Sequence, residues 1–64
     1  MVKINGEMKD VAGVTVSRFL STTNYDIKRI AVELNGEIVP KSEYCETTLK
    51  DGDSVEIVSF VGGG

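Results

Sequence analysis

Strand-like patterns occupy much of this chain. Apolar and polar residues alternate in residues 2–5, 30–35 and 54–60, and a shorter apolar run at 37–39 stops before a proline. A period of two is typical of a strand with one buried face, because successive side chains point to opposite sides of a sheet. A further short strand within residues 7–11 is expected to pair with the first one. The pattern therefore predicts five short strands.

One segment has a helical period instead. Apolar side chains at Val16, Phe19 and Leu20 have the i, i+3, i+4 spacing that forms a single stripe on a helix. Thr15 stands immediately before them and is a good N-cap residue. Residues 21–24, Ser-Thr-Thr-Asn, are poor helix formers, so we expect a short helix of about two turns.

Turn signals connect these elements into a fold. Asn-Gly pairs at 5–6 and 35–36 are the strongest short signal for a hairpin turn. The Asp-Gly-Asp sequence at 51–53 predicts a tight turn before the last strand, and residues 41–46 are expected to form a loop or one helical turn. The order strand, strand, helix, strand, strand, strand predicts an α+β fold with one helix across one face of a mixed sheet, which is the β-grasp or ubiquitin-like arrangement.

Composition excludes several classes of function. The 64 residues include no His and a single Cys, which excludes Ser-His-Asp or Cys-His catalysis, Cys/His zinc clusters and an intramolecular disulfide. No apolar run approaches the length of a membrane span, and the first residues show no signal-peptide pattern, so we expect a cytoplasmic protein that does not bind membranes. A self-sufficient enzyme is not expected.

The charge distribution gives a weaker indication of the kind of partner. The net charge of −3 argues against a nucleic-acid partner, which requires a basic surface. Residues 1–32 carry five basic and three acidic side chains, whereas residues 33–64 carry two basic and seven acidic ones. The acidic half could orient a basic partner surface, but from charge alone a solvated surface is the simpler interpretation.

The sequence ends in three glycines, Gly62, Gly63 and Gly64. Glycines contribute no side-chain packing and are costly to order, so we expect a domain over residues 1–61 followed by a flexible tail at 62–64. A tail without Cβ atoms can pass through a narrow channel, and four extended residues reach about 13–14 Å. The Gly64 carboxylate could thus enter the active site of another protein. A frayed chain end is the alternative interpretation.

The last strand predicts an apolar patch beside this tail. Its alternation places Val55 and Ile57 in the core and Glu56, Val58 and Phe60 on the opposite face. Two apolar side chains then lie on a face that should be polar, either under a covering loop or as a docking site for a partner. We favour docking, with Phe60 as the anchor.

Three other features have simpler interpretations. Cys45 has no Cys-X-X-Cys partner, so we expect a small, partly buried hydrophobic residue with no redox role. Asp51 and Asp53 flank a glycine, which favours turn chemistry over a metal site. Lys28 and Arg29 are expected to be solvated cations at the start of a strand.

The chain resembles a known family, the thiamin-biosynthesis sulfur carrier proteins (ThiS). Residues 30–40, Ile-Ala-Val-Glu-Leu-Asn-Gly-Glu-Ile-Val-Pro, are similar to the central segment of that family. Residues 49–57 resemble its last turn and strand, and the Asn-Gly-Glu hairpin at 5–7 and the helix start at 15–16 also fit. The resemblance therefore spans essentially the whole chain.

This resemblance implies a sulfur carrier, a protein co-substrate with no catalytic residue of its own. An E1-like adenylyltransferase would adenylate the Gly64 carboxylate, using ATP and Mg²⁺ that the partner binds. A persulfide from a cysteine desulfurase or another donor would displace AMP and leave a thiocarboxylate, from which thiazole synthase would take the sulfur. Gly62 and Gly63 would form the tail that lets the Gly64 carboxylate reach the active site of a partner. The carrier would be monomeric when free and would bind no cofactor or metal.

Two alternatives remain from the residues alone, because a fold does not determine a function. One is the small sulfur-carrier subunit of molybdopterin synthase, which uses the same tail chemistry; those relatives are longer and lack the Glu-Leu-Asn-Gly-Glu-Ile-Val-Pro sequence. The other is a ubiquitin-like protein modifier or interaction module, in which the tail is conjugated to lysine or is inert.

Overall fold

The computed structural model describes residues 1–60, and the predicted tail glycines and the predicted domain end at residue 61 lie outside them. The elements follow the predicted order, with two additional 3-10 turns. They are β1 (Val2–Ile4), β2 (Glu7–Lys9), α1 (Val16–Ser21), a 3-10 turn (Ile27–Arg29), β3 (Ile30–Leu34), β4 (Glu37–Val39), a 3-10 turn (Lys41–Glu43) and β5 (Ser54–Ser59). The α+β prediction is confirmed. The last strand ends one residue earlier than predicted.

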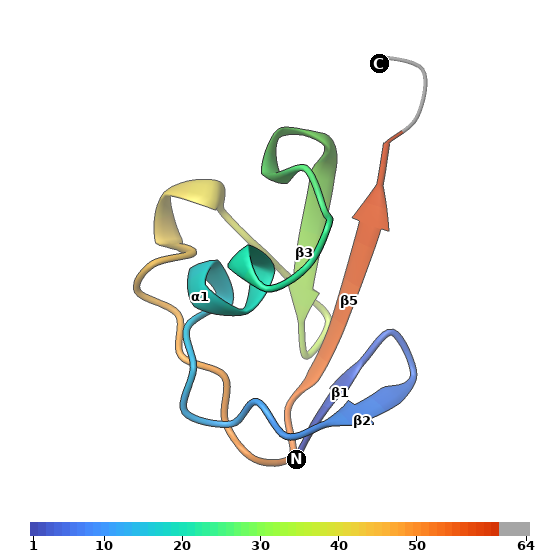
Figure 1. The fold of residues 1–64 in the computed structure, drawn as a ribbon, viewed down its shortest axis with the longest axis vertical. Coiled ribbons are helices and arrows are strands. Elements are labelled where there is room, and N and C mark those ends of the chain that lie inside the picture. Colours follow the sequence, from blue (N-terminus) through green and yellow to red (C-terminus); the bar gives the residue numbers. More distant parts are fainter. Residues whose placement is uncertain (61–64) are drawn as a thin grey trace.

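The five strands form one mixed sheet in the order β2-β1-β5-β3-β4. The last strand, β5, occupies the centre, parallel to β1 and antiparallel to β3. The helix α1 lies across one face of this sheet, and β5 runs from the end that holds the N-terminus toward the opposite end of the molecule (Figure 1). The strand that leads into the C-terminal residues is thus held between neighbours on both sides.

Both Asn-Gly pairs form the predicted hairpin turns. Asn5 and Gly6 have φ angles of 50° and 86°, and Asn35 and Gly36 have φ angles of 53° and 88°. Two consecutive residues with positive φ are the signature of a type I′ turn, whose twist matches that of the flanking strands. Asparagine tolerates this backbone region better than most residues, because its short polar side chain can form hydrogen bonds locally.

The core lies between α1 and the inner face of the sheet. The predicted helical stripe is buried, and so are the inward-facing apolar strand residues except Leu34, which is partly buried against the core. Residues 40–53 close the remaining side with Tyr44 and Leu49, which are 3% and 1% exposed. The buried set is Val2, Ile4, Val16, Phe19, Leu20, Ile30, Val32, Val39, Tyr44, Leu49, Val55 and Ile57. Burial raises the pKa of the Tyr44 hydroxyl, and a hydrogen bond with the Val32 backbone lowers it in part.

The first turn of α1 is capped from two directions. The Thr15 hydroxyl accepts a hydrogen bond from the Arg18 amide at 3.1 Å, as the sequence predicts for an N-cap. The amides of Val16 and Ser17 donate to the carbonyl oxygens of Thr47 and Tyr44, both at 2.9 Å. The loop thus satisfies helix amides that have no partner within the helix.

The prediction for Cys45 is wrong. Its side chain is exposed instead of partly buried. The turn that follows Lys41–Glu43 directs the aromatic ring of Tyr44 into the core, and the next side chain consequently faces solvent. The larger apolar side chain gains more from burial, which explains why Tyr44 and not Cys45 occupies the inward position.

Within residues 1–60, neither α1 nor any other helix has the length and apolar content needed to cross a membrane.

Candidate functional site

The two faces of β5 differ as the sequence predicts. Val55 and Ile57 are 2% and 7% exposed and face the core, whereas Val58 and Phe60 are 47% and 48% exposed. Glu56 shares the exposed face. The structure therefore brings together three of the predicted site residues on one open surface, which we call the outer face of β5. Gly62, Gly63 and Gly64 lie outside the described residues.

The neighbouring strand β3 extends this surface. In the antiparallel register Ala31 lies opposite Val58, and Glu33 lies opposite Glu56. Residues directly opposite in such a pair place their side chains on the same face of the sheet. The outer face therefore consists of an apolar strip toward the end of β5 and, next to it, a pair of facing carboxylates.

The pair of carboxylates is not neutralised within the described part of the chain. The ion pairs among residues 1–60 join the N-terminus to Asp51, Lys9 to Glu7 and Arg29 to Asp26, and none includes Glu33 or Glu56. Like charges directly opposite each other on adjacent strands destabilise a sheet. The arrangement thus leaves two negative groups available to a basic partner.

The far end of β5 is held from both sides. On the β3 side, the Phe60 amide donates a hydrogen bond to the Arg29 carbonyl oxygen at 2.7 Å. On the β1 side, the regular pairing reaches only to Ile4 and Val55, because the chain turns at Asn5. The Asn5 backbone amide still donates to the Val55 carbonyl oxygen at 2.9 Å.

The Asn5 side chain continues this pairing beyond the turn. Its Oδ1 accepts a hydrogen bond from the Ile57 amide at 2.7 Å, and its Nδ2 donates to the Ile57 carbonyl oxygen at 3.3 Å. Nδ2 also donates to the hydroxyl of Tyr25 at 3.3 Å. A side-chain amide presents the same donor and acceptor as a peptide group, so Asn5 takes the place of a further residue of β1.

Asn35 makes a related contact at the opposite end of β5. Its Oδ1 accepts from the Ser54 amide at 2.9 Å, and its Nδ2 donates to Asp53 Oδ1 at 3.1 Å. The other oxygen of Asp53 accepts from the Lys50 amide at 2.8 Å. Asp53 thus has the predicted turn role, and no group of three or more metal-ligating side chains forms among residues 1–60.

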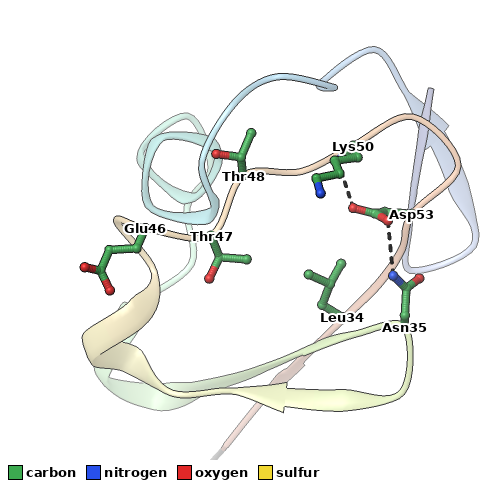
Figure 2. A pocket seen from close by; sticks show the side chains of 7 residues that line it. All are labelled: Leu34, Asn35, Glu46, Thr47, Thr48, Lys50 and Asp53. Carbon is green, nitrogen blue, oxygen red and sulfur yellow. Dashed lines mark hydrogen bonds between the residues drawn. The ribbon is translucent and has the colours of Figure 1, made fainter.

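These groups border a pocket of about 430 Å³ between the end of β3 and the loop before β5, shown in Figure 2. The pocket is an open depression with a mostly polar lining, and hydrogen bonds connect Asp53 to Asn35 and Lys50 at its border. The pocket lies at the Ser54 end of β5, away from Phe60, and contains none of the predicted site residues.

The sequence signal for Asn5 indicated only a turn. An Asn-Gly pair predicts the backbone conformation, but no local pattern shows that the side chain reaches a residue 52 positions away. The contact with Tyr25 is equally non-local. Lys28 and Arg29 are exposed as expected, and the backbone carbonyl of Arg29, which the sequence did not single out, holds the end of β5.

Comparison with known proteins agrees with this geometry. The chain matches the ThiS family over residues 2–64. It is 38% identical to the sulfur carrier protein ThiS of Thermus thermophilus over the full length of both. It is 48% identical over 62 residues to a thiazole synthase of Paramagnetospirillum magneticum, of which it spans 19%. The crystal structure of the thiamine biosynthesis protein ThiS from Geobacter metallireducens superposes with a TM-score of 0.80 at 37% identity, covering 98% of this chain and 97% of that one.

Proposed function

This chain belongs to the ThiS family, the small sulfur carrier proteins of thiamine biosynthesis, and we propose that it carries its sulfur on the carboxylate of Gly64. Such a protein is a carrier and not a catalyst. In the proposed role it is a protein co-substrate, consumed and regenerated by partner enzymes. The match to the family continues through Gly64, which supports the assignment of the reacting group.

The proposed chemistry begins with activation, because a free carboxylate is a poor electrophile. An E1-like adenylyltransferase converts the Gly64 carboxylate and ATP into an acyl adenylate and pyrophosphate, with Mg²⁺ bound by the enzyme. The terminal sulfur of a persulfide, supplied by a cysteine desulfurase or another donor, attacks the acyl carbon and AMP leaves. Reduction of the resulting S–S bond by a thiol releases the thiocarboxylate. We place these steps in the cytoplasm, where ATP is available.

One observation carries the proposal from the structure. The central strand β5 is held as far as Ile57 on the β1 side, and the chain is held as far as Phe60 on the β3 side. The chain then continues into a segment whose last three residues are glycines. Glycines present no side chain to the walls of a channel, so a partner can enclose the segment closely. A fixed strand that leads into such a segment suits delivery of a terminal carboxylate.

The outer face of β5 is the proposed docking surface for the adenylating enzyme. Phe60 stands four residues before Gly64, so any active site that holds the carboxylate lies near this side chain. An exposed aromatic residue beside an apolar strip is typical of an interface anchor. The facing carboxylates of Glu33 and Glu56 favour a partner that presents a basic side chain at this position.

The names of two relatives suggest thiazole synthase as the acceptor of the sulfur. The chain matches 19% of the length of one thiazole synthase and 20% of another, which is consistent with a carrier and a synthase that work together. The molybdopterin synthase alternative is not favoured, because the similar sulfur carriers and structures belong to thiamine biosynthesis.

Mass spectrometry tests the proposal directly. The protein is incubated with the adenylating enzyme, ATP and a persulfide source, and is then fragmented to locate any exchange of one oxygen for sulfur. We expect the exchange at Gly64 only. Localisation is needed because oxidation of Met1 or Met8, which are 55% and 58% exposed, gives a similar mass increase elsewhere. A chain that lacks Gly64 is the matched control and should remain unmodified at its terminus.

A further inference from the structure

The amide of Asn5 occupies an unusual position, because it bonds to both backbone groups of a residue on the strand that leads to the tail. We propose that Asn5 is a positioning residue for sulfur loading, and this inference rests on the proposed function. Asn5 fixes the end of β5, so that the docking side chains and the entry to residues 61–64 are presented together in one geometry.

The need for such a contact follows from the sheet. The pairing of β1 with β5 ends at Ile4 and Val55, since the chain reverses at Asn5. The next residue of β5 whose backbone groups face β1 is Ile57, which would have no partner there without the Asn5 side chain. The Asn5 amide therefore lengthens the two-sided part of β5 by two residues toward Phe60.

Two further contacts make this arrangement rigid. The hydroxyl of Tyr25 accepts from Asn5 Nδ2 and thereby fixes the orientation of the amide. On the other side of β5, the Phe60 amide donates to the Arg29 carbonyl oxygen. Beyond Val55, the Asn5 side chain thus holds β5 on the β1 side, whereas the β3 side is held by strand pairing as far as Ser59 and by the Phe60–Arg29 hydrogen bond. Loss of the Asn5 contact leaves this part of β5 held on the β3 side only.

A looser strand end should lower the population of carrier that can dock. The apparent affinity of a partner falls in proportion to the fraction of molecules in the competent state. Chemistry in the bound state is unaffected, because Asn5 lies on the β1–β2 turn and not among the reacting groups. The proposal therefore predicts a change in the KM for the carrier with little change in kcat.

The chain provides a matched control for this test. Asn35 occupies the same type of turn, with φ of 53° against 50° for Asn5, and its side chain also bonds to a β5 amide, but at the Ser54 end. Glycine accepts these φ angles, so Asn5→Gly and Asn35→Gly each keep the turn and remove the side-chain contacts. Only the first variant affects the end of β5 that leads to the tail.

The experiment measures adenylation kinetics as carrier-dependent exchange of pyrophosphate into ATP, with both variants shown to be folded at the assay temperature by circular dichroism. We expect Asn5→Gly to raise the KM for the carrier about threefold to tenfold, with kcat unchanged within about twofold. Asn35→Gly should keep the wild-type KM.

Amide hydrogen exchange of the Phe60 N–H gives a second readout that needs no partner. We expect Asn5→Gly to accelerate exchange at Phe60, while Asn35→Gly leaves it unchanged. An unchanged KM in Asn5→Gly, an equal increase in Asn35→Gly, or unchanged Phe60 exchange in both would overturn the positioning role. Failure of the wild-type chain to support exchange of pyrophosphate would instead contradict the proposed function, and the Phe60 measurement would still test whether Asn5 fixes the strand end.

Discussion

Glu33 on β3 lies directly opposite Glu56 on β5, on the outer face of the sheet. Facing like charges cost stability, and removal of one charge should recover it. We therefore expect Glu33→Gln to raise the free energy of unfolding by about 0.2–1 kcal/mol in urea titrations. The same change should weaken binding to the adenylating enzyme, and the loss should shrink at high salt, because screening reduces the attraction between the carboxylates and a basic partner group.

Glu46→Gln is the control for this experiment, because Glu46 is exposed but lies in the loop before β5. Its removal changes the net charge equally and should leave binding close to that of the wild type. A Glu33→Gln protein that is less stable than the wild type would contradict the repulsion between the two carboxylates. A Glu33→Gln protein that binds as well as the wild type at every salt concentration would show that the pair has no docking role.

Ile57 faces the core from β5, whereas Phe60, directly after the end of β5, is exposed, and this difference separates their expected effects. Phe60→Ala should weaken binding to the adenylating enzyme by about 1–3 kcal/mol, the range for an interface anchor. Ile57→Ala should reduce the free energy of unfolding by about 2–5 kcal/mol, because it leaves a cavity in the core. Affinity and unfolding free energy are measured for both variants. Equal destabilisation by the two changes would contradict the assignment of Phe60 to the outer face.

Tyr44 should make the protein sensitive to alkali. Because burial raises the pKa of its hydroxyl in the folded state, the unfolded chain loses this proton first as the pH rises above about 10. The folded state then binds more protons than the unfolded state, so the free energy of unfolding falls as the pH rises from that value through the folded-state pKa. Denaturant titrations of the wild type and Tyr44→Phe between pH 8 and the alkaline range isolate this contribution. The free energy of unfolding of the wild type, minus that of Tyr44→Phe, should be constant below about pH 9 and should fall above it.

Cys45 should be dispensable. Its side chain is exposed, and exposed substitutions away from special features usually change stability by less than about 0.5 kcal/mol. We expect Cys45→Ser to unfold like the wild type and to accept sulfur at Gly64 at the same rate. A loss of thiocarboxylate in this variant would reveal a role for the thiol in sulfur handling.

Local patterns were sufficient for the elements whose geometry is set by neighbouring residues. Three such features are found as predicted: the two Asn-Gly turns, the N-cap at Thr15, and the alternation of buried and exposed side chains from Val55 to Val58. Each depends on spacing within a few positions. The α+β order then followed from the sequence of elements. These features also sufficed to predict that Glu56, Val58 and Phe60 share an exposed face.

Contacts between distant parts of the chain were not predictable in this way. Residues 40–53 have no periodic pattern, so the burial of Tyr44 and Leu49 was not expected, and Cys45 was assigned to the wrong environment. The Asn5 contact with Ile57 arises only because β1 and β5 are neighbours in the sheet, although they stand at opposite ends of the sequence. Such contacts depend on topology, which a single hydrophobic pattern does not specify.

The most direct test of the account is the site of sulfur incorporation. The wild-type chain and a chain without Gly64 are treated with the adenylating enzyme, ATP and a persulfide source, and their terminal fragments are compared by mass spectrometry alongside thermal unfolding. We predict a thiocarboxylate at Gly64 of the wild type, none in the shortened chain, and the same unfolding temperature for both, because a terminal glycine adds no packing to the core. ATP-dependent thiocarboxylate formation in the shortened chain, or its absence from the wild type, would contradict the account.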